Sequence, residues 1–388
     1  MSTSVELLPS DLIFEILTRI TSLKALDTCK SICKSWNKLI HEPRFMPLYC
    51  QRTRNLSGYF ILDKDRTHRS GMTRFVSIDQ LIEEEEKDCG SVYDVVYMEE
   101  LLDYLTILAS CNQGIFCCLR RRKYYYACKP ASRQCQLLLN PEILYQTAAI
   151  AIMVLSSSPL RYKIVRLSVG CVEGDVRKYN SEIFDSKIWT WKETQYVTLQ
   201  RDEFILRSST TVSAGNSIYW LTSHDNVLAF HEPEGTFQKF PLPEEVVRDK
   251  NKYHYCKNWK VYKKLLDYQG RLGLIIICNT QEQGETELWI TYENPRNCTN
   301  WREKIVMQDE ENIGTSVTHP SLAGLYNDAV AFLKAFYRFV LYTPEHYSLS
   351  RVKGYYNPRH EREIFRFRSD LEPVNLGGDG GTEIGFRW

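Results

Sequence analysis

The sequence has no long hydrophobic run and almost no net charge. Its longest apolar stretch, residues 148–155, is far too short to cross a bilayer, and the first residues lack the basic and then apolar order of a secretory signal. A formal net charge of +1 gives the whole chain no attraction for phosphate or for an acidic membrane. We therefore expect no membrane partner and no nucleic-acid partner, and a location in the cytoplasm, the nucleus or both.

Patterns that bind metal are also missing. The chain has 13 cysteines and 8 histidines, but no Cys-x-x-Cys pair occurs and the histidines are scattered. Cys29 and Cys33 share one helix face inside an apolar stripe, where small core residues are expected. The odd cysteine count, without a secretory signal, also argues against a disulfide scaffold. We predict reduced thiols, no metal and no cofactor.

Motifs for catalysis are absent as well. The sequence contains no Gly-x-Ser-x-Gly elbow, no phosphate-binding loop and no dinucleotide fingerprint. Carboxylates are plentiful, but a catalytic pair cannot be recognised without geometry. We predict a non-enzymatic protein with no catalytic residues. A hydrolase is the weaker alternative, and it would need an acidic or histidine cluster at one mouth of a propeller channel.

The composition that is present is typical of a folded globular protein. Hydrophobic residues make up 43% of the chain and charged residues 25%. A length of 388 residues leaves room for a small unit together with one large domain or two ordinary ones.

The first 50 residues have the period of short helices. Pro9 and Ser10 are typical of a helix start, and Asp11 places a carboxylate at the positive end of the helix dipole. Apolar residues then recur at spacings of three and four in two segments. They are Leu12, Ile13, Phe14, Ile16, Leu17 and Ile20 in the first, and Leu23, Leu26, Cys29, Ile32, Cys33, Trp36, Leu39 and Ile40 in the second. A unit of about 40 residues is near the lower limit for independent folding, so its excess apolar surface must pack on the rest of the chain or on another protein.

The same residues resemble the F-box motif in the form common in plants. The resemblance rests on residues 8–17 (LPSDLIFEIL) and residues 33–40 (CKSWNKLI). Thr21 departs from the motif, since many relatives have proline there, although threonine can also cap a helix. In that family the motif docks on a Skp-type adaptor, which joins a cullin-based ubiquitin ligase.

The resemblance implies a set of adaptor-binding residues in this chain. They are Leu8, Pro9, Leu12, Ile13, Ile16, Leu17, Leu26, Cys33, Trp36 and Ile40. The alternative is that the same residues form only an intramolecular helical core.

The chain changes character at about residue 105. From there to about residue 365, short segments rich in β-branched and aromatic residues alternate with turn clusters, which is typical of an all-β domain. Units of several strands repeat at roughly 40 to 50 residues, and this predicts a propeller-like arrangement. A β-sandwich is the alternative topology, because the repeats lack the double glycine of kelch units and the Trp-Asp pair of WD units. We expect the basic residues 120–123 to form a solvated hairpin tip, and we expect these tryptophans to be core anchors: Trp189, Trp191, Trp220, Trp289 and Trp301.

This second region resembles the plant F-box-associated domain. The matching blocks are residues 109–114 (ASCNQG), 128–134 (CKPASRQ), 156–165 (SSSPLRYKIV) and 182–185 (EIFD), followed by Trp189 and Trp191. Gln113, inserted before the glycine, and Lys129, where asparagine is usual, depart from the pattern. The resemblance covers most of residues 105–350. In the family this domain recruits the protein to be ubiquitinated, and its partners vary.

Together these features predict a multidomain α+β chain with four segments. We expect a helical F-box unit at 1–50, a connecting segment with an acidic loop and a strand (residues 58–62) at 51–104, a β domain at 105–365 and a flexible tail at 366–388. We predict that the chain is the substrate-recognition subunit of a Skp-cullin-F-box ubiquitin ligase. No motif in the sequence identifies its target protein. The alternative is a stand-alone peptide- or carbohydrate-binding module that no longer binds the adaptor.

Overall fold

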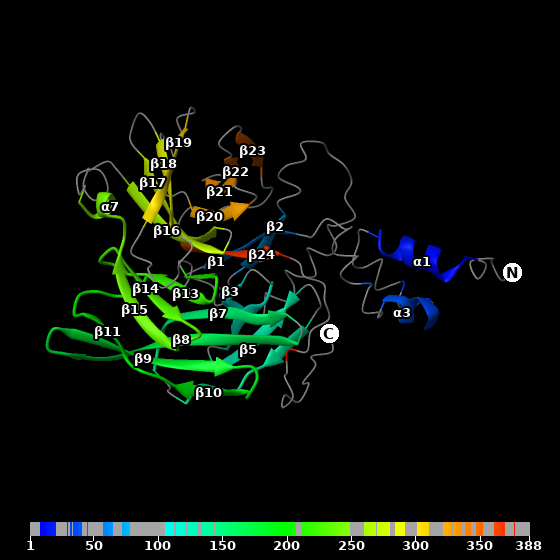
Figure 1. Cartoon of the computed structure of the whole chain (residues 1–388), viewed down its shortest axis with the longest axis horizontal. Coiled ribbons are helices and arrows are strands. Elements are labelled where there is room, and N and C mark those ends of the chain that lie inside the picture. Colours follow the sequence, from blue (N-terminus) through cyan, green and yellow to red (C-terminus); the bar gives the residue numbers. More distant parts are fainter. Residues whose placement is uncertain are drawn as a thin grey trace.

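The computed structural model describes the β-rich part of the chain more fully than the N-terminal part. The described residues are 8–20, 29, 32, 34–40, 45, 57–64, 72–77, 105–111, 114–121, 123–130, 134–142, 145–157, 159–206, 211–248, 260–268, 270–279, 284–291, 301–309, 321–326, 329–334, 338–342, 347–351, 361–368 and 376. In Figure 1 the two N-terminal helices lie at one end of the molecule and the strands lie together beside them.

The N-terminal helices agree with the apolar period of the sequence. Helix α1 (Ser10–Leu17) begins after Pro9, whose carbonyl accepts hydrogen bonds from the amides of Leu12 and Ile13 at 3.0 and 3.1 Å. The N-cap is Pro9 and not Ser10, and no side chain caps this end. Helix α3 (Lys34–Ile40) contacts α1. None of the described helices is long and apolar enough to cross a membrane.

The described strands form six antiparallel sheets. The first contains β1 (Ser57–Lys64), β2 (Met72–Ser77) and β24 (Glu361–Arg368). The second contains β3 (Thr106–Ser110), β4 (Phe116–Arg120), β5 (Tyr124–Lys129) and β6 (Gln134–Leu137). The third contains β7 (Thr147–Ser157), β8 (Leu160–Glu173), β9 (Val176–Asp185), β10 (Thr190–Glu193) and β11 (Val197–Gln200).

The remaining three sheets follow in chain order. The fourth contains β12 (Val212–Ala214), β13 (Ser217–Leu221), β14 (Asn226–His231) and β15 (Thr236–Pro241), followed by the short helix α7 (Glu244–Arg248). The fifth contains β16 (Lys260–Tyr268), β17 (Arg271–Asn279), β18 (Gly284–Thr291) and β19 (Trp301–Asp309). The sixth contains β20 (Ser321–Tyr326), β21 (Ala329–Lys334), β22 (Arg338–Tyr342) and β23 (Tyr347–Arg351).

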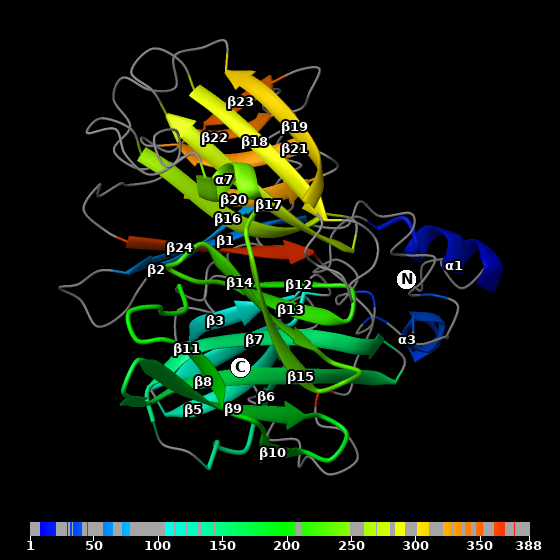
Figure 2. The ribbon, with the colours of Figure 1, turned by 60° about the vertical axis from the view of Figure 1, so that its left-hand side comes forward.

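One strand from each sheet contacts the corresponding strand of the next. The contacts run from β3 to β7, β12, β16, β20 and β24, and β24 in turn contacts β3. In Figure 2, β24 lies between β20 above and β3 below. No described sheet closes on itself as a barrel; the sheets instead follow one another around a circuit. This part of the chain, which we call the β body, is therefore mostly β and propeller-like, in agreement with the repeat and unlike the two facing sheets of a sandwich.

The first sheet joins strands from distant parts of the sequence. Residues 57–64 pair with residues 361–368 along their whole length, with Phe60 opposite Phe365. The predicted strand at 58–62 is therefore confirmed, and it belongs to a sheet of the β body. Phe60, Phe116 and Phe367 form an aromatic group, with ring centroids 5.2 to 5.9 Å apart. This packing joins the first sheet to the second.

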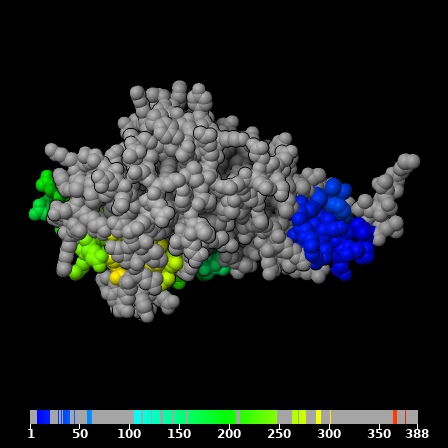
Figure 3. All heavy atoms as spheres, turned by 90° about the horizontal axis from the view of Figure 1, so that it is seen from above, coloured from blue at the N-terminus to red at the C-terminus, as the bar shows by residue number. Residues whose placement is uncertain are grey.

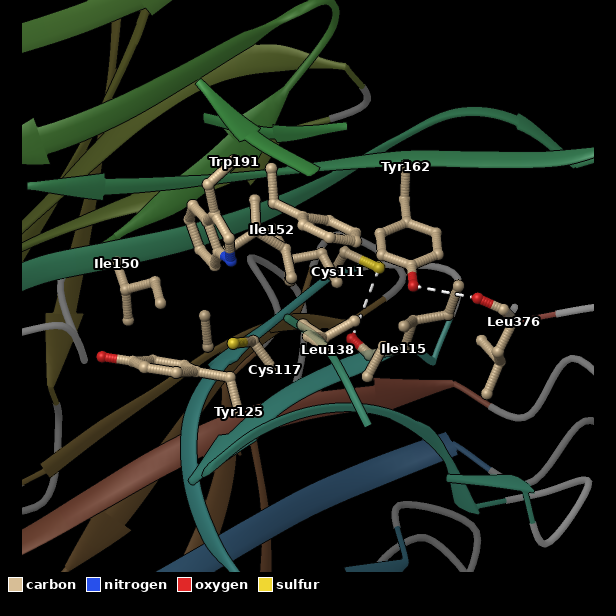
Figure 4. Close-up of a cluster of buried hydrophobic side chains, with 14 residues drawn as sticks. Cys111, Ile115, Cys117, Tyr125, Leu138, Ile150, Ile152, Tyr162, Trp191 and Leu376 are labelled. Atoms are coloured by element: carbon tan, nitrogen blue, oxygen red, sulfur yellow. Dashed lines mark hydrogen bonds between the residues drawn. The ribbon is translucent and has the colours of Figure 1, made fainter. Parts of the chain in front are cut away.

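The third sheet shows why residues 149–153, within the predicted apolar run, are apolar at every position. Ile150 and Ile152 pack in a cluster with residues of the second sheet (Figure 4), whereas Ala149 and Ala151 pack with residues of the fourth sheet. Because both faces of β7 are covered, its sequence is a continuous apolar run and not an alternating one.

Ion pairs connect neighbouring sheets near their turns. The Lys163 ammonium on β8 lies 2.7 Å from the Glu232 carboxylate, which follows β14. The Lys263 ammonium on β16 lies 2.8 Å from the carboxylate of Asp225, a turn residue with φ 57°. These pairs join the third sheet to the fourth and the fourth to the fifth.

The predicted tryptophan anchors are in the core. Trp191, Trp220 and Trp289 are buried, and Trp189 and Trp301 pack half-buried against the same clusters. Trp189, in the turn before β10, and Trp191, on β10, both contact the Phe184 ring, at centroid distances of 5.1 and 5.5 Å.

The prediction of reduced thiols is wrong at one pair. Cys128 on β5 and Cys135 on β6 form a disulfide, with their Cα atoms 4.1 Å apart. The cause is the register of the hairpin, which places the two residues directly opposite each other. The sequence shows only their separation of seven residues and not this pairing.

Candidate protein-docking surface

One side of α1 exposes a row of apolar side chains. Leu12 and Ile16 are four residues apart and lie on one face of α1, and Leu8 precedes the helix, directly before Pro9. They are 42%, 51% and 52% exposed. We call these three residues the apolar row. Large apolar residues grouped in this way at a surface are typical of a protein-docking site.

The opposite side of α1 packs in the small core of the helical unit. The buried apolar residues of this core, among those described, are Phe14, Leu17, Ile40 and Phe45. The rings of Phe14 and Phe45 meet edge to face, with centroids 5.4 Å apart. The residues of the apolar row do not belong to this core and lie at the surface. In Figure 3 the described N-terminal residues, in blue, lie at the surface at one end of the molecule.

The structure divides the residues that the F-box resemblance implies into four groups. The exposed group contains Leu8, Pro9, Leu12 and Ile16, and the half-buried group contains Ile13 and Trp36. The buried group contains Leu17 and Ile40. The fourth group, Leu26 and Cys33, lies outside the described residues, as does the predicted cap Thr21. Of the exposed members, Leu12 and Ile16 lie on α1, and Leu8 and Pro9 directly precede it. The buried members belong to the core that supports it.

Ile32 is an apolar surface residue that is absent from the implied set. It is 60% exposed, more than any residue of the apolar row. Its place in the second apolar segment was visible in the sequence, but the three- and four-residue period does not tell which member faces the core. Only the packing of the helices decides this.

Charged residues of both signs border the apolar row. Asp11 is exposed in the first turn of α1, and the Arg19 guanidinium lies 3.5 Å from the Glu15 carboxylate. The Thr18 hydroxyl donates a hydrogen bond to the Glu15 carbonyl at 3.0 Å, where the helix ends. An apolar centre with a polar rim is the usual anatomy of a protein–protein interface.

Buried carboxylates in the β body are candidates for a catalytic site, and Glu203 is one of those that are fully buried. Thr222 Oγ1 and Asn226 Nδ2 donate to its Oε1 at 2.6 and 2.9 Å, and Lys239 Nζ donates to its Oε2 at 2.9 Å. Burial alone raises the pKa of the Glu203 carboxyl, but the hydrogen bonds outweigh burial and lower this pKa to about 2. A carboxylate held in this way stays charged and fixes the connection after β11 to the fourth sheet.

A second buried ion pair and two buried thiols have the same structural character. The Arg166 guanidinium bonds the Glu182 carboxylate and the Thr147 hydroxyl, and both charged side chains are almost fully buried. Burial raises the pKa of the Cys117 thiol to about 12, and burial together with the charge of Cys117 raises the pKa of Cys118. Thiols with raised pKa values are poor nucleophiles.

Metal ligation requires several donor side chains in one place. Within the described ranges, no group of three or more His, Cys, Asp or Glu residues could hold a metal ion. The apolar row remains the candidate docking site within the described part of the chain.

Comparisons with known proteins give relatives for this chain. No protein-family model matches it. Three Arabidopsis thaliana proteins described as F-box proteins are similar in sequence. The first is 30% identical over 166 residues, covering 41% of this chain and 84% of the relative. The second is 24% identical over 247 residues, covering 61% of each chain, and the third is 28% identical over 217 residues, covering 55% of this chain and 53% of the relative. The match thus spans most of the first relative and part of the other two.

Among solved structures, the similarities are low. YCF48 bound to D1 peptide aligns with a TM-score of 0.36 and 11% identity, covering 70% of this chain and 81% of that chain. BBS1N in complex with ARL6DN aligns with a TM-score of 0.31 and 12% identity, covering 64% of this chain and 66% of that chain.

Proposed function

This chain is a plant F-box protein, and on that premise we propose that it is the substrate-binding subunit of a Skp-cullin-F-box ubiquitin ligase. The helical unit binds a Skp-type adaptor, and through it a cullin. The β body binds the protein to be ubiquitinated. Ubiquitin transfer belongs to the other subunits, and this chain contributes proximity by raising the effective concentration of the target near them.

The apolar row carries the docking half of the proposal. Leu8, Leu12 and Ile16 each leave about half of their side chain in water, although their neighbours Phe14 and Leu17 are buried. Burying the exposed part of such side chains against an adaptor is favourable by about 1 kcal/mol for each. Pro9 starts the helix and fixes the direction in which the row faces.

The other residues of the implied set have two roles in this proposal. Leu17 and Ile40 support the surface from the core, because both are buried behind it. Ile13 and Trp36 lie at the edge of that core and are placed to contribute to both. Leu26 and Cys33 remain adaptor-binding candidates from the resemblance alone.

The recruitment half of the proposal is supported by the architecture of the β body. Its six sheets present many turns and connections at their ends, and such loops on a rigid scaffold are where binding sites usually lie. We propose that this recruiting unit runs from residue 57 to residue 368, since β1 and β24 pair along their whole length. It follows that the complex works in the cytoplasm or the nucleus, where cullin ligases act.

Binding to a Skp-type adaptor is the test of this function. The full chain is co-expressed with a plant Skp-type adaptor, and binding is compared with that of the double variant Leu12→Asp, Ile16→Asp. Two charges inside a buried apolar interface are expected to weaken binding by about 100-fold or more. The matched control is Leu139→Asp, because Leu139 lies in the β body and is 51% exposed, as Leu12 is. This control is expected to bind as the wild type does.

Two outcomes would contradict the proposal. The wild-type chain fails to bind any Skp-type adaptor, in which case a stand-alone binding module is the better description. Alternatively, the double variant binds as tightly as the wild type, in which case the apolar row is not the docking surface.

A further inference from the structure

A residue near the C-terminal end of the sequence lies inside the β body. Strand β24 ends at Arg368, yet Leu376 is only 4% exposed and belongs to the cluster between the second and third sheets. In Figure 4 it lies on the same side of this cluster as Tyr162 and Ile115, whereas Trp191 lies on the other side. The chain thus returns to the β body after its last strand and places one leucine between two sheets.

The backbone of Leu376 is held as well as its side chain. The Tyr162 hydroxyl donates a hydrogen bond to the Leu376 carbonyl at 3.1 Å. Burial raises the pKa of this hydroxyl far above its usual value, and the charge of Cys117 adds to the effect. The hydroxyl is therefore always a donor. We call the place that Leu376 occupies the recess at Tyr162. It is lined by apolar side chains and contains a hydroxyl that donates to a main-chain carbonyl.

These two features are those of a peptide-binding subsite. Such subsites combine apolar lining with a few placed polar groups that fix the direction of the ligand. Neither feature depends on a covalent connection between the leucine and the rest of the chain. The flanking sequence adds no further specific side chain on one side, because Leu376 is followed by Gly377-Gly378-Asp379-Gly380-Gly381.

We propose that the recess at Tyr162 is a peptide-binding site that Leu376 occupies in cis, and that a leucine-bearing segment of another protein can take its place. The recess is formed at the β3–β4 turn, by Cys111 and Ile115, and at the start of β8, by Tyr162. Under the proposed function, the segment that takes the place of Leu376 belongs to the target protein. The site itself does not depend on adaptor binding.

Occupation in cis sets a threshold for any competing peptide. A tethered segment has an effective concentration in the millimolar range, so a free ligand binds only when its affinity or its local concentration overcomes this competition. Removing the leucine side chain from the tether opens the site. The expected signature is a variant that binds a peptide more tightly than the wild type does.

The probe is a fluorescein-labelled synthetic peptide with the sequence of residues 370–382, and its anisotropy is measured with the full chain. Binding to Leu376→Asp is expected to be about 10-fold tighter than binding to the wild type, and a probe with aspartate in place of its leucine is expected not to bind. Adding Tyr162→Phe to Leu376→Asp removes the donor and is expected to weaken probe binding. The matched control is Leu371→Asp, a leucine of the same segment that lies outside the described residues, and it is expected to bind the probe as the wild type does.

Three results would overturn the proposal. One is equal affinity of the probe for the wild type and for a folded Leu376→Asp variant. Another is the absence of binding to that folded variant. The third is loss of the folded β body, measured by thermal unfolding, in both Leu376→Asp and the milder Leu376→Ala, because Leu376 is then a permanent core residue. Adaptor binding is measured on the same samples and is expected to be unchanged, so failure of this proposal is distinguishable from failure of the proposed function.

Discussion

The helical unit and the β body bury their apolar residues to very different extents. In the helical unit four described apolar side chains are buried, while the three residues of the apolar row are exposed on α1 or directly before it. In the β body, several clusters of ten or more buried residues lie between successive sheets, and β7 is covered on both faces. The difference follows from size, because a small unit has too little interior to enclose its own apolar surface.

Under the proposed function, the two regions have different roles: the β body supplies a stable scaffold, and the helical unit supplies a docking surface. The large clusters make the β body a stable scaffold, whose surface is free to carry loops of varied sequence. A unit as small as the helical one is near the lower limit for independent folding, and under the proposed function a partner covers the apolar row. Four substitutions test this contrast, and they are described from the largest expected effect to the smallest.

Trp220→Ala is expected to cause the largest loss of stability. Trp220 is fully buried in the cluster between the third and fourth sheets, so its removal leaves a large cavity. We expect the free energy of unfolding of the β body to fall by about 3–5 kcal/mol in urea titration. The control is Trp301→Ala, a half-buried tryptophan whose loss should lower the unfolding free energy by about 1 kcal/mol. If the two substitutions lowered the unfolding free energy equally, burial of Trp220 between the third and fourth sheets would not be what stabilises the β body.

Leu17→Ala is expected to act on the helical unit alone. Leu17 is fully buried in a core of four residues, and its truncation removes about 2–5 kcal/mol of stability, comparable with everything that such a unit has. We expect the α1 amides to lose protection in hydrogen exchange and adaptor binding to be lost, while the melting temperature of the β body is unchanged. A lower melting temperature of the β body would contradict the separation of the two regions.

Glu203→Gln is expected to change the acid stability of the β body. The folded-state pKa of the Glu203 carboxyl is about 2, below its ordinary value of 4.5, so its ionised form stabilises the fold above pH 4.5 and this contribution is lost as the pH falls toward 2. The contribution amounts to about 2–3 kcal/mol. Unfolding free energies measured between these pH values should therefore fall more steeply for the wild type than for Glu203→Gln. Equal slopes would contradict the role of the Thr222, Asn226 and Lys239 hydrogen bonds.

The repeating pattern of strands could be read from the sequence, but the closure of the circuit could not. Alternating strand and turn segments predicted the sheets from β3 onward, and residues 58–62 were recognised as a strand. Their pairing with residues 361–368 joins segments that are about 300 residues apart, and no local period encodes such a partner. The disulfide between Cys128 and Cys135 was also missed. Although the two residues are close in the sequence, their pairing depends on the register of the β5–β6 hairpin, which the sequence pattern does not show.

The docking surface could be located from the sequence to one helix but not to one face. The apolar period placed both exposed and buried residues in one set. The period marks every apolar position of the helix, whether that position packs in the core or lies at the surface. Only the packing of α1 in the small core with Phe45 and Ile40 shows that Leu17 is buried and that Leu12 is exposed. Leu376 was expected in a flexible tail, since glycine composition signals disorder and a single buried leucine leaves no pattern.

Glu15→Gln is expected to have the smallest effect of the four. The Glu15 carboxylate and the Arg19 guanidinium are 42% and 71% exposed and 3.5 Å apart, so water screens their attraction. We expect the unfolding free energy of the helical unit, measured by hydrogen exchange of the α1 amides, to change by less than about 0.5 kcal/mol. This isosteric substitution matches Glu203→Gln in the β body, where the same chemical change acts on a buried group. If the two substitutions destabilised their regions equally, burial would not be what distinguishes the β body from the helical unit.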